Sequence, residues 1–308
     1  MITTQCIWKN GVLIPWQAAQ IHVLTHGLHY GSAVFEGIRF YKTDKGSAIF
    51  KLKEHIQRFF YSAKQLGMQI PYNETQICQA IVETLQKSGC EEGYIRPLAF
   101  YGYGNMKVVP TADLPVEIII ACWPWKDYLS APVVDVAISP FIRIHPQSTV
   151  ADAKISGHYV NSILAGLAIQ NTHYHEVLLL DAEGFVAEGS AENIFIVKNN
   201  RILTTPKGTI LMGITRETVM QIAKDLNLVV EEKRFKPEEI YSAEEAFFSG
   251  TAVEITAIRS LDGQVIAQGN IGIITESIKT RYQKIVHGQV PAFHSALTWI
   301  EKEEVMTV

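Results

Sequence analysis

One lysine is distinguished by its surroundings. Lys154 lies in the segment VADAKISGHYVNSI, which carries few charges and precedes an apolar helix expected near residues 159–170. A lysine placed there either lays its apolar stem along the surface with the amine in water, or presents a functional amine. Residues elsewhere in the chain bear on this choice.

A functional lysine could form a Schiff base with an aldehyde, and pyridoxal phosphate is a cofactor that supplies one. That cofactor would need a carboxylate at its ring nitrogen, N–H groups and a basic side chain at its phosphate, and a donor at its phenolate oxygen. Glu188, in GFVAEGSAENIF, is an acidic residue among small and apolar neighbours. Because burying such a charge is costly unless it is paired, Glu188 is the candidate carboxylate.

Two turns could supply the N–H groups. The run from Met212 to Thr215 leads directly into a helix with Glu217 in its first turn, and the first N–H groups of a helix have no partner within it. The turn Ser249-Gly250-Thr251 follows an expected strand. Either turn alone is also explained by ordinary helix capping. Together with Lys154 and Glu188, the two turns are candidates for a single pyridoxal phosphate site.

The hydrophobic pattern predicts the elements that must position these residues. Amphipathic or apolar helices are expected at residues 53–67, 74–88, 159–170 and 215–228. Strands are expected at residues 94–102, 116–125, 133–141, 176–181, 184–189, 193–204 (a hairpin) and 244–250. Strands with interspersed helices and no internal repeat indicate an α+β or mixed α/β fold.

Composition excludes several classes of protein. The 308 residues are 47% hydrophobic, with 27 basic and 31 acidic side chains and a formal net charge of −4, so no basic surface for nucleic acid is expected. The four cysteines are irregularly spaced, which favours reduced thiols. The N-terminus is not typical of a signal peptide, and no apolar run is long enough for a membrane span. We expect a cytoplasmic protein.

Three other patterns do not indicate the chemistry that their spacing suggests. His22, His26 and His29 have a metal-like spacing, but ordinary packing and hydrogen bonding are the favoured explanation, and no metal is expected. Gly102-x-Gly104 lacks the third glycine and the helix of a dinucleotide loop. No G-x-S-x-G motif surrounds Ser190, so a serine hydrolase is not indicated.

Several blocks in order resemble the class IV aminotransferases, which are the fold type IV pyridoxal phosphate enzymes, and most of all the branched-chain amino acid aminotransferases. The blocks are HGLHYGSAVFEGIRFY, LKEHIQRF, YIRPLAF, AKISGHYVNSILAG, LLLDAEGFVAEGSAENIF, GITRETV and FFSGTAVEITAIRSLDG, and they cover nearly the whole chain. The resemblance implies the two-domain D-amino acid aminotransferase-like fold. It places a smaller N-terminal α/β domain at 1–127, a linker at 128–135, and a larger β-barrel-like domain with helices at 136–308, with the cofactor between the domains.

The resemblance also implies roles for single residues toward pyridoxal 5'-phosphate. Lys154 would form the Schiff base and move the proton between the substrate's α-carbon and the cofactor. Glu188 would keep the ring nitrogen protonated, Tyr159 would donate to the phenolate oxygen, and Arg58 would pair with the phosphate. The remaining cofactor-binding residues would be Leu211, Gly213, Ile214, Thr215, Gly250 and Thr251.

For the substrate, the resemblance implies an aliphatic pocket that also accepts a carboxylate. Arg96 would receive the distal carboxylate of glutamate, and its forked guanidinium suits that role. Alternatively, Tyr94 and Arg96 could alternate on the solvent face of a strand. The other substrate-binding residues would be Tyr94, Thr251 and Ala252 at the α-carboxylate, and Tyr30, Phe35, Gly37, Tyr128 and Met106 around the side chain, the last from a neighbouring subunit. Lys107 departs from the small residue that the family tends to have, which bears on substrate range.

The implied function is ping-pong transamination between L-leucine, L-isoleucine or L-valine and 2-oxoglutarate. A D-amino acid aminotransferase or an aminodeoxychorismate lyase of the same fold is the alternative, although the Tyr94-x-Arg96 pattern favours the branched-chain enzymes. A third hypothesis, of a different class, is a protein that binds pyridoxal phosphate without turnover. By resemblance the chain would form a homo-oligomer, with a dimer as the minimum unit and a hexamer as the larger option.

Overall fold

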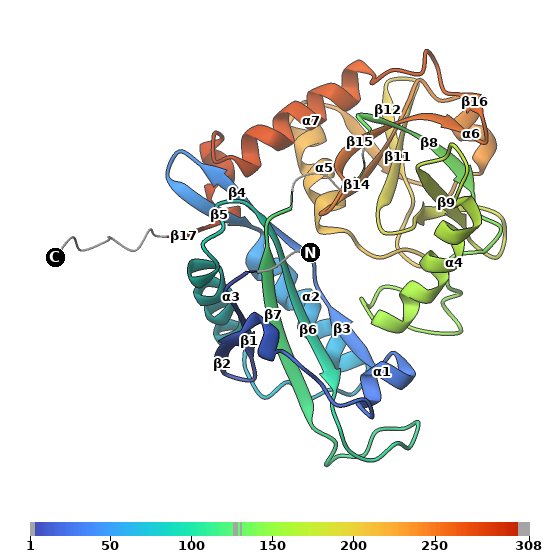
Figure 1. Cartoon of the computed structure of the whole chain (residues 1–308). Coiled ribbons are helices and arrows are strands. Elements are labelled where there is room, and N and C mark those ends of the chain that lie inside the picture. Colours follow the sequence, from blue (N-terminus) through green and yellow to red (C-terminus); the bar gives the residue numbers. More distant parts are fainter. Residues whose placement is uncertain (1–3, 126–128, 130, 301–308) are drawn as a thin grey trace. The chain divides into compact units, whose positions relative to one another are not determined.

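The chain folds into two compact units in a computed structural model that describes residues 4–125, 129 and 131–300 (Figure 1). Unit 1 comprises the described residues within 1–126, 153–157 and 285–308, and unit 2 those within 127–152 and 158–284. The short segment around Lys154 therefore packs with unit 1, although its neighbours in sequence belong to unit 2. Within the expected linker 128–135, Tyr128 and Ser130 lie outside the described residues, and Val133 begins a strand.

Unit 1 is built on an antiparallel sheet in the order β17-β5-β4-β6-β7-β1-β2, with β3 also paired to β6. Its strands are β1 (Cys6–Lys9), β2 (Val12–Pro15), β3 (Ala33–Phe35), β4 (Ile38–Thr43), β5 (Gly46–Phe50), β6 (Gly93–Tyr101), β7 (Val116–Trp123) and β17 (Leu297–Ile300). Its helices are η1 (Trp16–Ala18), α1 (His26–Tyr30), α2 (Leu52–Gln65), α3 (Glu74–Ser88) and η3 (Pro291–Ala296).

Helices α2 and α3 form where local sequence signals favour them. Asn73 and Gln76 make a reciprocal capping box at the start of α3, with both hydrogen bonds 2.9 Å long, and Gly89 ends the helix in the left-handed region at φ 71°. In α2 the apolar face carries Ile56 and Phe59, both fully buried. These helices confirm the predictions for 53–67 and 74–88 to within two residues.

Unit 2 contains a second sheet in the order β10-β9-β8-β15-β14-β11-β12-β13, with β16 paired to β15. Its strands are β8 (Val133–Ile138), β9 (Glu176–Leu180), β10 (Val186–Gly189), β11 (Asn193–Lys198), β12 (Arg201–Thr204), β13 (Val229–Glu232), β14 (Glu245–Gly250), β15 (Glu254–Leu261) and β16 (Gln264–Val265). Its helices are α4 (Tyr159–Ile169), α5 (Ile214–Asp225), α6 (Pro237–Tyr241) and the larger part of α7 (Ile273–Val286); η2 (Ser156–His158) precedes α4.

The sheet of unit 2 curls on itself, so its first and last strands approach one another. The N–H of Val186 in β10 donates to the carbonyl of Phe235, just beyond β13, over 2.9 Å. The hydroxyl of Thr205, at the end of β12, donates to the carbonyl of Ala187 over 2.8 Å. The curled sheet encloses an apolar core that includes Phe248 and Ile196. It agrees with the barrel-like domain that the resemblance implies.

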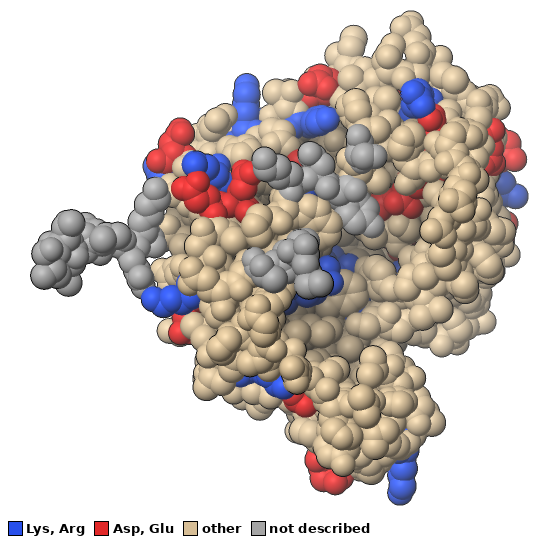
Figure 2. Space-filling model, in the orientation of Figure 1, with Lys and Arg blue, Asp and Glu red and all other residues tan. Residues whose placement is uncertain are grey.

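Both signs of charge are interspersed on the face shown in Figure 2, which fits the small net charge of −4. Among the described residues, no helix is both long enough and apolar enough to span a membrane.

Candidate functional site

The backbone of the Lys154 segment is fixed against β3 and α2 within unit 1. The N–H of Lys154 donates to the Ser62 hydroxyl over 2.9 Å, and its carbonyl accepts from the N–H of Phe35 over 3.3 Å. One residue later, Ile155 forms an antiparallel bridge with Val34. At the far end, Gly31 has φ 63°, and a Cβ there would lie 2.9 Å from the Cα of Gly157, so only glycine allows this close approach.

The side chain of Lys154 lies beside an aromatic ring and close to a polar helix face. Its Nζ is 4.9 Å from the centre of the Phe35 ring. On α2, His55, Arg58 and Ser62 are three and four residues apart and therefore share one face. Because the Ser62 hydroxyl accepts from the Lys154 N–H, this face of α2 lies directly beside the lysine segment.

Three aromatic rings surround the guanidinium of Arg96. Its central carbon lies 4.8 Å from the Phe35 ring centre, 5.5 Å from that of Tyr94 and 5.8 Å from that of Trp123. Tyr94 is only 6% exposed, which makes the solvent-face alternative for this strand wrong. The Nε of Arg96 is buried and bonds to no residue that the structure describes. A buried donor among aromatic walls can receive a carboxylate of a largely apolar ligand.

The loop after β6 is tied to the segment around α1. The Tyr30 hydroxyl donates to the Met106 carbonyl over 2.9 Å. The Nε2 of buried His26 lies 2.9 Å from the Lys107 carbonyl, so this nitrogen carries the proton, and Nδ1 then accepts from the Ser32 hydroxyl at 2.7 Å.

The other two histidines of the metal-like trio also bond to the backbone. His29 Nε2 lies 2.8 Å from the Val23 carbonyl, and His22 Nδ1 accepts from the N–H of Leu24 over 3.1 Å. The hydrogen-bonding interpretation of the trio is therefore confirmed. No metal-binding group of three or more ligands occurs in the described part of the chain.

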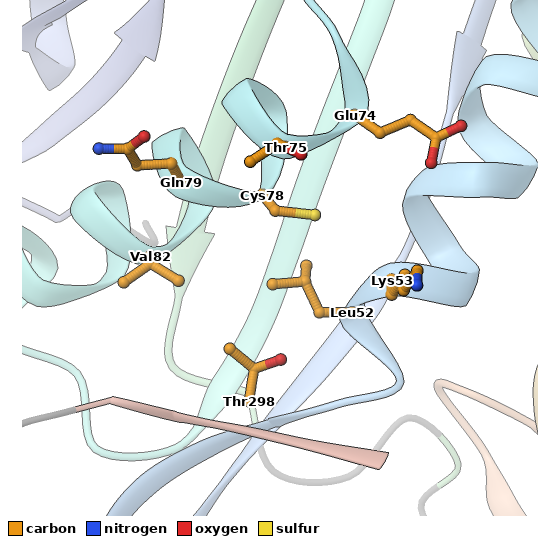
Figure 3. A pocket seen from close by; sticks show the side chains of 8 residues that line it. All are labelled: Leu52, Lys53, Glu74, Thr75, Cys78, Gln79, Val82 and Thr298. Carbon is orange, nitrogen blue, oxygen red and sulfur yellow. The ribbon is translucent and has the colours of Figure 1, made fainter. Parts of the chain in front are cut away.

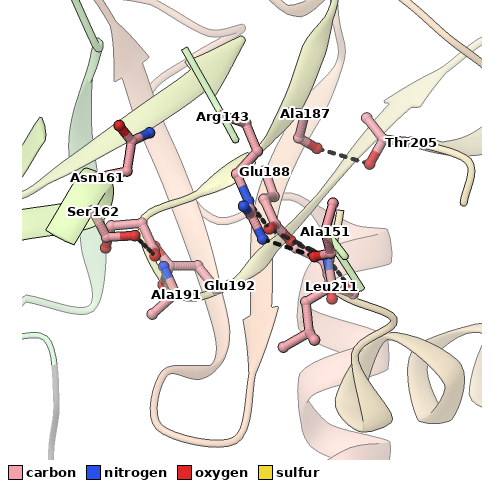
Figure 4. Close-up of polar contacts among 12 residues, drawn as sticks. Arg143, Ala151, Asn161, Ser162, Ala187, Glu188, Ala191, Glu192, Thr205 and Leu211 are labelled. Atoms are coloured by element: carbon pink, nitrogen blue, oxygen red, sulfur yellow. Dashed lines mark hydrogen bonds and ion pairs between the residues drawn. The ribbon is translucent and has the colours of Figure 1, made fainter. Parts of the chain in front are cut away.

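Within unit 2, Glu188 is 5% exposed and its carboxylate is surrounded by N–H donors (Figure 4). Arg143 Nε donates to Oε1 over 2.6 Å, Asn193 Nδ2 donates to Oε2 over 3.0 Å, and the backbone N–H of Leu211 lies 3.2 and 3.1 Å from the two oxygens. Charged and neutral donors of this kind offset the cost of burying an anion. Glu188 is thus a buried acid with protein partners, and its role toward the ring nitrogen stays a prediction.

The start of α5 lies close to Glu188 within unit 2. Asn193 also donates to the Leu211 carbonyl over 2.9 Å, and a Cβ on Gly213 would lie 2.0 Å from the Asn193 Oδ1, so glycine is required there. No side chain among the described residues caps α5, whose N-cap is Gly213. Its first N–H groups can therefore serve an anionic ligand.

The predicted site residues thus fall into two groups, each in its own unit. Unit 1 holds Tyr30, Phe35, Gly37, Arg58, Tyr94, Arg96, Met106 and Lys154. Unit 2 holds Tyr159, Glu188, Leu211, Gly213, Ile214, Thr215, Gly250, Thr251 and Ala252. Tyr128 lies outside the described residues.

Sequence reasoning missed the partners of the buried charges. Arg143 and Asn193 hold Glu188, and Glu36 accepts from Arg58. Glu36 follows AVF and precedes GIRF, so the signal that singled out Glu188, an acid in an apolar run, was also present here. Arg143 lies 45 residues from Glu188 and has no comparable local signal.

Two more buried acids, Glu176 and Glu192, lie near Glu188. Burial raises the pKa of Glu192 well above its ordinary value, and the negative charges of Glu176 and Glu188 raise it further. Burial also raises the pKa of Glu176. Two adjoining carboxyls in this environment share a proton more readily than they both ionise.

Glu192→Gln is expected to make the protein less sensitive to alkaline pH. A carboxyl whose pKa is raised on folding contributes its stability below the unfolded pKa of about 4.3 and loses it as pH rises through the folded pKa. The variant should therefore melt about 2–4 °C above wild type near pH 8.5 and close to wild type near pH 5. Differential scanning calorimetry at both pH values measures this. The same offset at both pH values would contradict it, and Glu183→Gln, at an exposed position, is the control.

A separate pocket in unit 1 lies between α2, α3 and Thr298 of β17 (Figure 3). Its lining includes Cys78, and burial raises the pKa of that thiol, so the reactive thiolate form is disfavoured. Lys53 and Glu74 line the pocket but are exposed. The residues that line this pocket do not include any of the predicted site residues.

Comparison with known proteins shows the family of the chain. Residues 33–261 match the family model described as amino-transferase class IV. The chain belongs to this family, whose members are pyridoxal phosphate-dependent aminotransferases.

The names of individual relatives are more specific than the description of the family model. The chain is 42% identical to a branched-chain-amino-acid aminotransferase of Pseudomonas aeruginosa, over 93% of this chain and 94% of the relative. It is 37% identical to the protein of the same name in Escherichia coli, over 92% and 93%. Among solved structures, a branched-chain amino acid aminotransferase of Thermoproteus uzoniensis with norvaline has a TM-score of 0.92 and 39% identity, over 96% of this chain and 99% of the other.

A further solved structure carries a ligand whose name bears on the cofactor. It is a branched-chain amino acid aminotransferase complexed with N-(5'-phosphopyridoxyl)-L-glutamate. Its TM-score is 0.95 and its identity 40%, over 98% of this chain and all of the other.

Proposed function

We propose that this protein transfers the amino group between branched-chain L-amino acids and 2-oxoglutarate. The names of its relatives support the branched-chain class of substrate. The observation that carries the proposal is Arg96, whose buried Nε bonds to no described residue and whose guanidinium lies between aromatic rings. Aromatic walls suit leucine, isoleucine and valine, and the guanidinium suits the distal carboxylate of glutamate.

The proposed cofactor is pyridoxal 5'-phosphate, which the name of the phosphopyridoxyl ligand in the solved relative supports. When bound, it supplies an aldehyde for the amino group and a ring that accepts the electron pair released at the substrate's α-carbon. The buried carboxylate of Glu188 and the uncapped start of α5 fit its ring nitrogen and its phosphate.

Each residue then has a defined task. Lys154 would hold the cofactor covalently, and its Nζ, once the substrate's amino group has displaced it, could accept the proton of the substrate's α-carbon. Glu188, fixed by Arg143 and Asn193, keeps the ring nitrogen positively charged. The N–H groups of Ile214 and Thr215 in unit 2, and Arg58 in unit 1, are each candidates for binding the phosphate.

The substrate panel is the direct test. Purified protein with 2-oxoglutarate should convert L-leucine, L-isoleucine and L-valine to their 2-oxo acids, with glutamate formation measured by a coupled assay. Turnover of D-alanine alone would favour the D-amino acid alternative. Protein that is colourless, and to which borohydride fixes no cofactor, would contradict the proposed cofactor.

Gly37→Ala is expected to damage this pocket. A Cβ at position 37 would lie 1.8 Å from the Tyr94 hydroxyl oxygen and 2.6 Å from its Cζ, so the ring must move. Displacing a positioning group by an ångström can cost about 10²-fold, and we expect a loss of this order in kcat/KM for L-leucine. Gly166→Ala, where a Cβ meets nothing within 4 Å, is the matched control. Unchanged kinetics with folded Gly37→Ala protein would show that the ring has no such role.

We also propose that the protein is a homo-oligomer with a dimer as its minimum unit. Val160, Ile163, Leu164 and Leu167 of α4 recur at helical spacing and are 41–59% exposed. A second copy would cover this apolar stripe. Sedimentation should give a dimer or larger for wild type and a smaller species for Ile163→Glu; a wild-type monomer at micromolar concentration would contradict the proposal.

A further inference from the structure

A buried carboxylate holds Arg58 in place. Glu36, in the turn between β3 and β4, has no exposed surface. Arg58 Nε donates to Oε1 over 2.6 Å and Nη2 donates to Oε2 over 2.9 Å, which makes a two-point contact with one edge of the guanidinium. His55 Nδ1 lies 2.8 Å from Oε2, and the N–H of Gly37 donates to the same oxygen over 3.3 Å.

The protonation states follow from this geometry. Burial alone would raise the pKa of Glu36, but the Arg58 charge and the hydrogen bonds from Arg58 and His55 outweigh it and hold that pKa well below its usual range. Burial lowers the pKa of His55, although its bond to Glu36 acts in the other direction. His55 is therefore neutral, and its Nδ1 carries the proton that it donates to Glu36.

Stability alone is a weak reason for such a cluster. A buried ion pair seldom contributes more than apolar side chains of the same volume would. The two-point contact does, however, fix the plane of the Arg58 guanidinium and hence the direction of its N–H groups. Arg58 also shares its helix face with Ser62, which bonds to the Lys154 backbone. Helix α2 therefore fixes the positions of Arg58 and of the Lys154 backbone relative to one another.

We propose that Glu36 and His55 are positioning residues that orient Arg58 toward the phosphate monoester of the cofactor held by Lys154. The inference rests on the proposed function and deepens it, since it assigns the phosphate selectivity of the site to two residues that need not touch the cofactor. Their removal should weaken binding of the phosphate while leaving binding of the unphosphorylated aldehyde unchanged.

Binding of two probes tests this in the full chain freed of cofactor. The dissociation constants of pyridoxal 5'-phosphate and of pyridoxal are measured by absorbance titration. Glu36→Gln places an amide N–H₂ among the N–H donors that now converge on the carboxylate, so we expect the dissociation constant of pyridoxal phosphate to rise about 10-fold or more. That of pyridoxal should stay within about 2-fold. Glu54→Gln, at a partly exposed position of the same helix, is the control and should change neither.

A double-variant cycle shows whether Glu36 acts through Arg58. Adding Glu36→Gln to Arg58→Ala should weaken binding of pyridoxal phosphate no further, because the residue being positioned is already absent. Additive losses would overturn the inference, as would an equal loss for both probes with Glu36→Gln.

His55 provides a second route should Glu36→Gln fail to fold. His55→Leu removes the donor, and we expect a several-fold selective loss for pyridoxal phosphate. His55→Asn keeps an N–H at the same distance from the backbone as Nδ1 and should restore binding. An equal loss in both variants would overturn the inference. Normal cofactor selectivity in wild type without branched-chain turnover would instead overturn only the proposed function.

Discussion

Lys154→Ala is expected to abolish amino transfer while leaving the fold intact. The variant lacks the amine that the arrangement of β3, α2 and residues 153–157 holds beside Phe35, so it has neither the covalent link to the cofactor nor the group that moves the α-proton. Loss of proton transfer alone would cost about 10²- to 10⁴-fold. Multiple turnovers of L-leucine with 2-oxoglutarate, followed by glutamate formation, measure the effect.

A matched exposed lysine separates this loss from a general effect of removing charge. Lys64→Ala changes an exposed residue of α2 and should leave turnover and melting temperature near wild type. Mass spectrometry after borohydride reduction should show one cofactor fixed to wild type at Lys154 and none to Lys154→Ala. Retained multiple turnover in Lys154→Ala would mean that another group performs the chemistry.

Glu188→Gln is expected to cause the second largest loss. The substitution keeps the volume of the side chain but removes the negative charge that Arg143, Asn193 and the N–H of Leu211 now surround. The ring nitrogen would no longer be held in its charged form, and Arg143 would face a neutral amide. We expect kcat to fall about 10²- to 10³-fold, as when one preorganised charge partner is removed.

Spectroscopy and a second variant distinguish this cause from misfolding. The absorbance spectrum of the bound cofactor should shift in Glu188→Gln, because the charge on its ring changes, while circular dichroism of the protein stays constant. Glu276→Gln, at an exposed position of α7, should alter neither. Near-normal kcat in Glu188→Gln would show that the partner of the ring nitrogen lies elsewhere.

The sequence predicted the family, four of the seven α-helices and eight of the seventeen strands that the structure describes, because these depend on local pattern and on ordered motifs. It did not predict α7 or most of the strands of unit 1. It also marked Glu188 as a buried acid that needs partners. It did not identify Arg143 as that partner, since the pairing depends on how β10 and the segment after β8 meet in the folded unit. The contact between Glu36 and Arg58 was missed for the same reason, because it joins a turn after β3 to a helix 22 residues further along the chain.

Tyr94 and Arg96 show a further limit of prediction from the sequence. Alternation along a strand fixes that both side chains point to the same face of β6, but not which face is covered. Only the folded sheet shows which face is covered, because there Tyr94 is buried and aromatic rings surround Arg96. The composition of the segment around Lys154 likewise gave no sign that it pairs with β3, because backbone pairing over more than a hundred residues leaves no local trace.

That pairing has a consequence for the order of folding. Unit 1 is completed by residues 153–157 and by β17. Strand β17 lies at the C-terminal end of the described chain and pairs with β5, which lies in its first fifty residues. During synthesis, β3 and α2 therefore emerge long before the strand and the lysine segment that complete their surroundings. Contacts so distant in sequence delay closure of a unit. The Lys154 segment can therefore pair with β3 as soon as it has been synthesised, whereas the edge of the sheet at β5 stays unpaired until β17 follows the last described residues of unit 2.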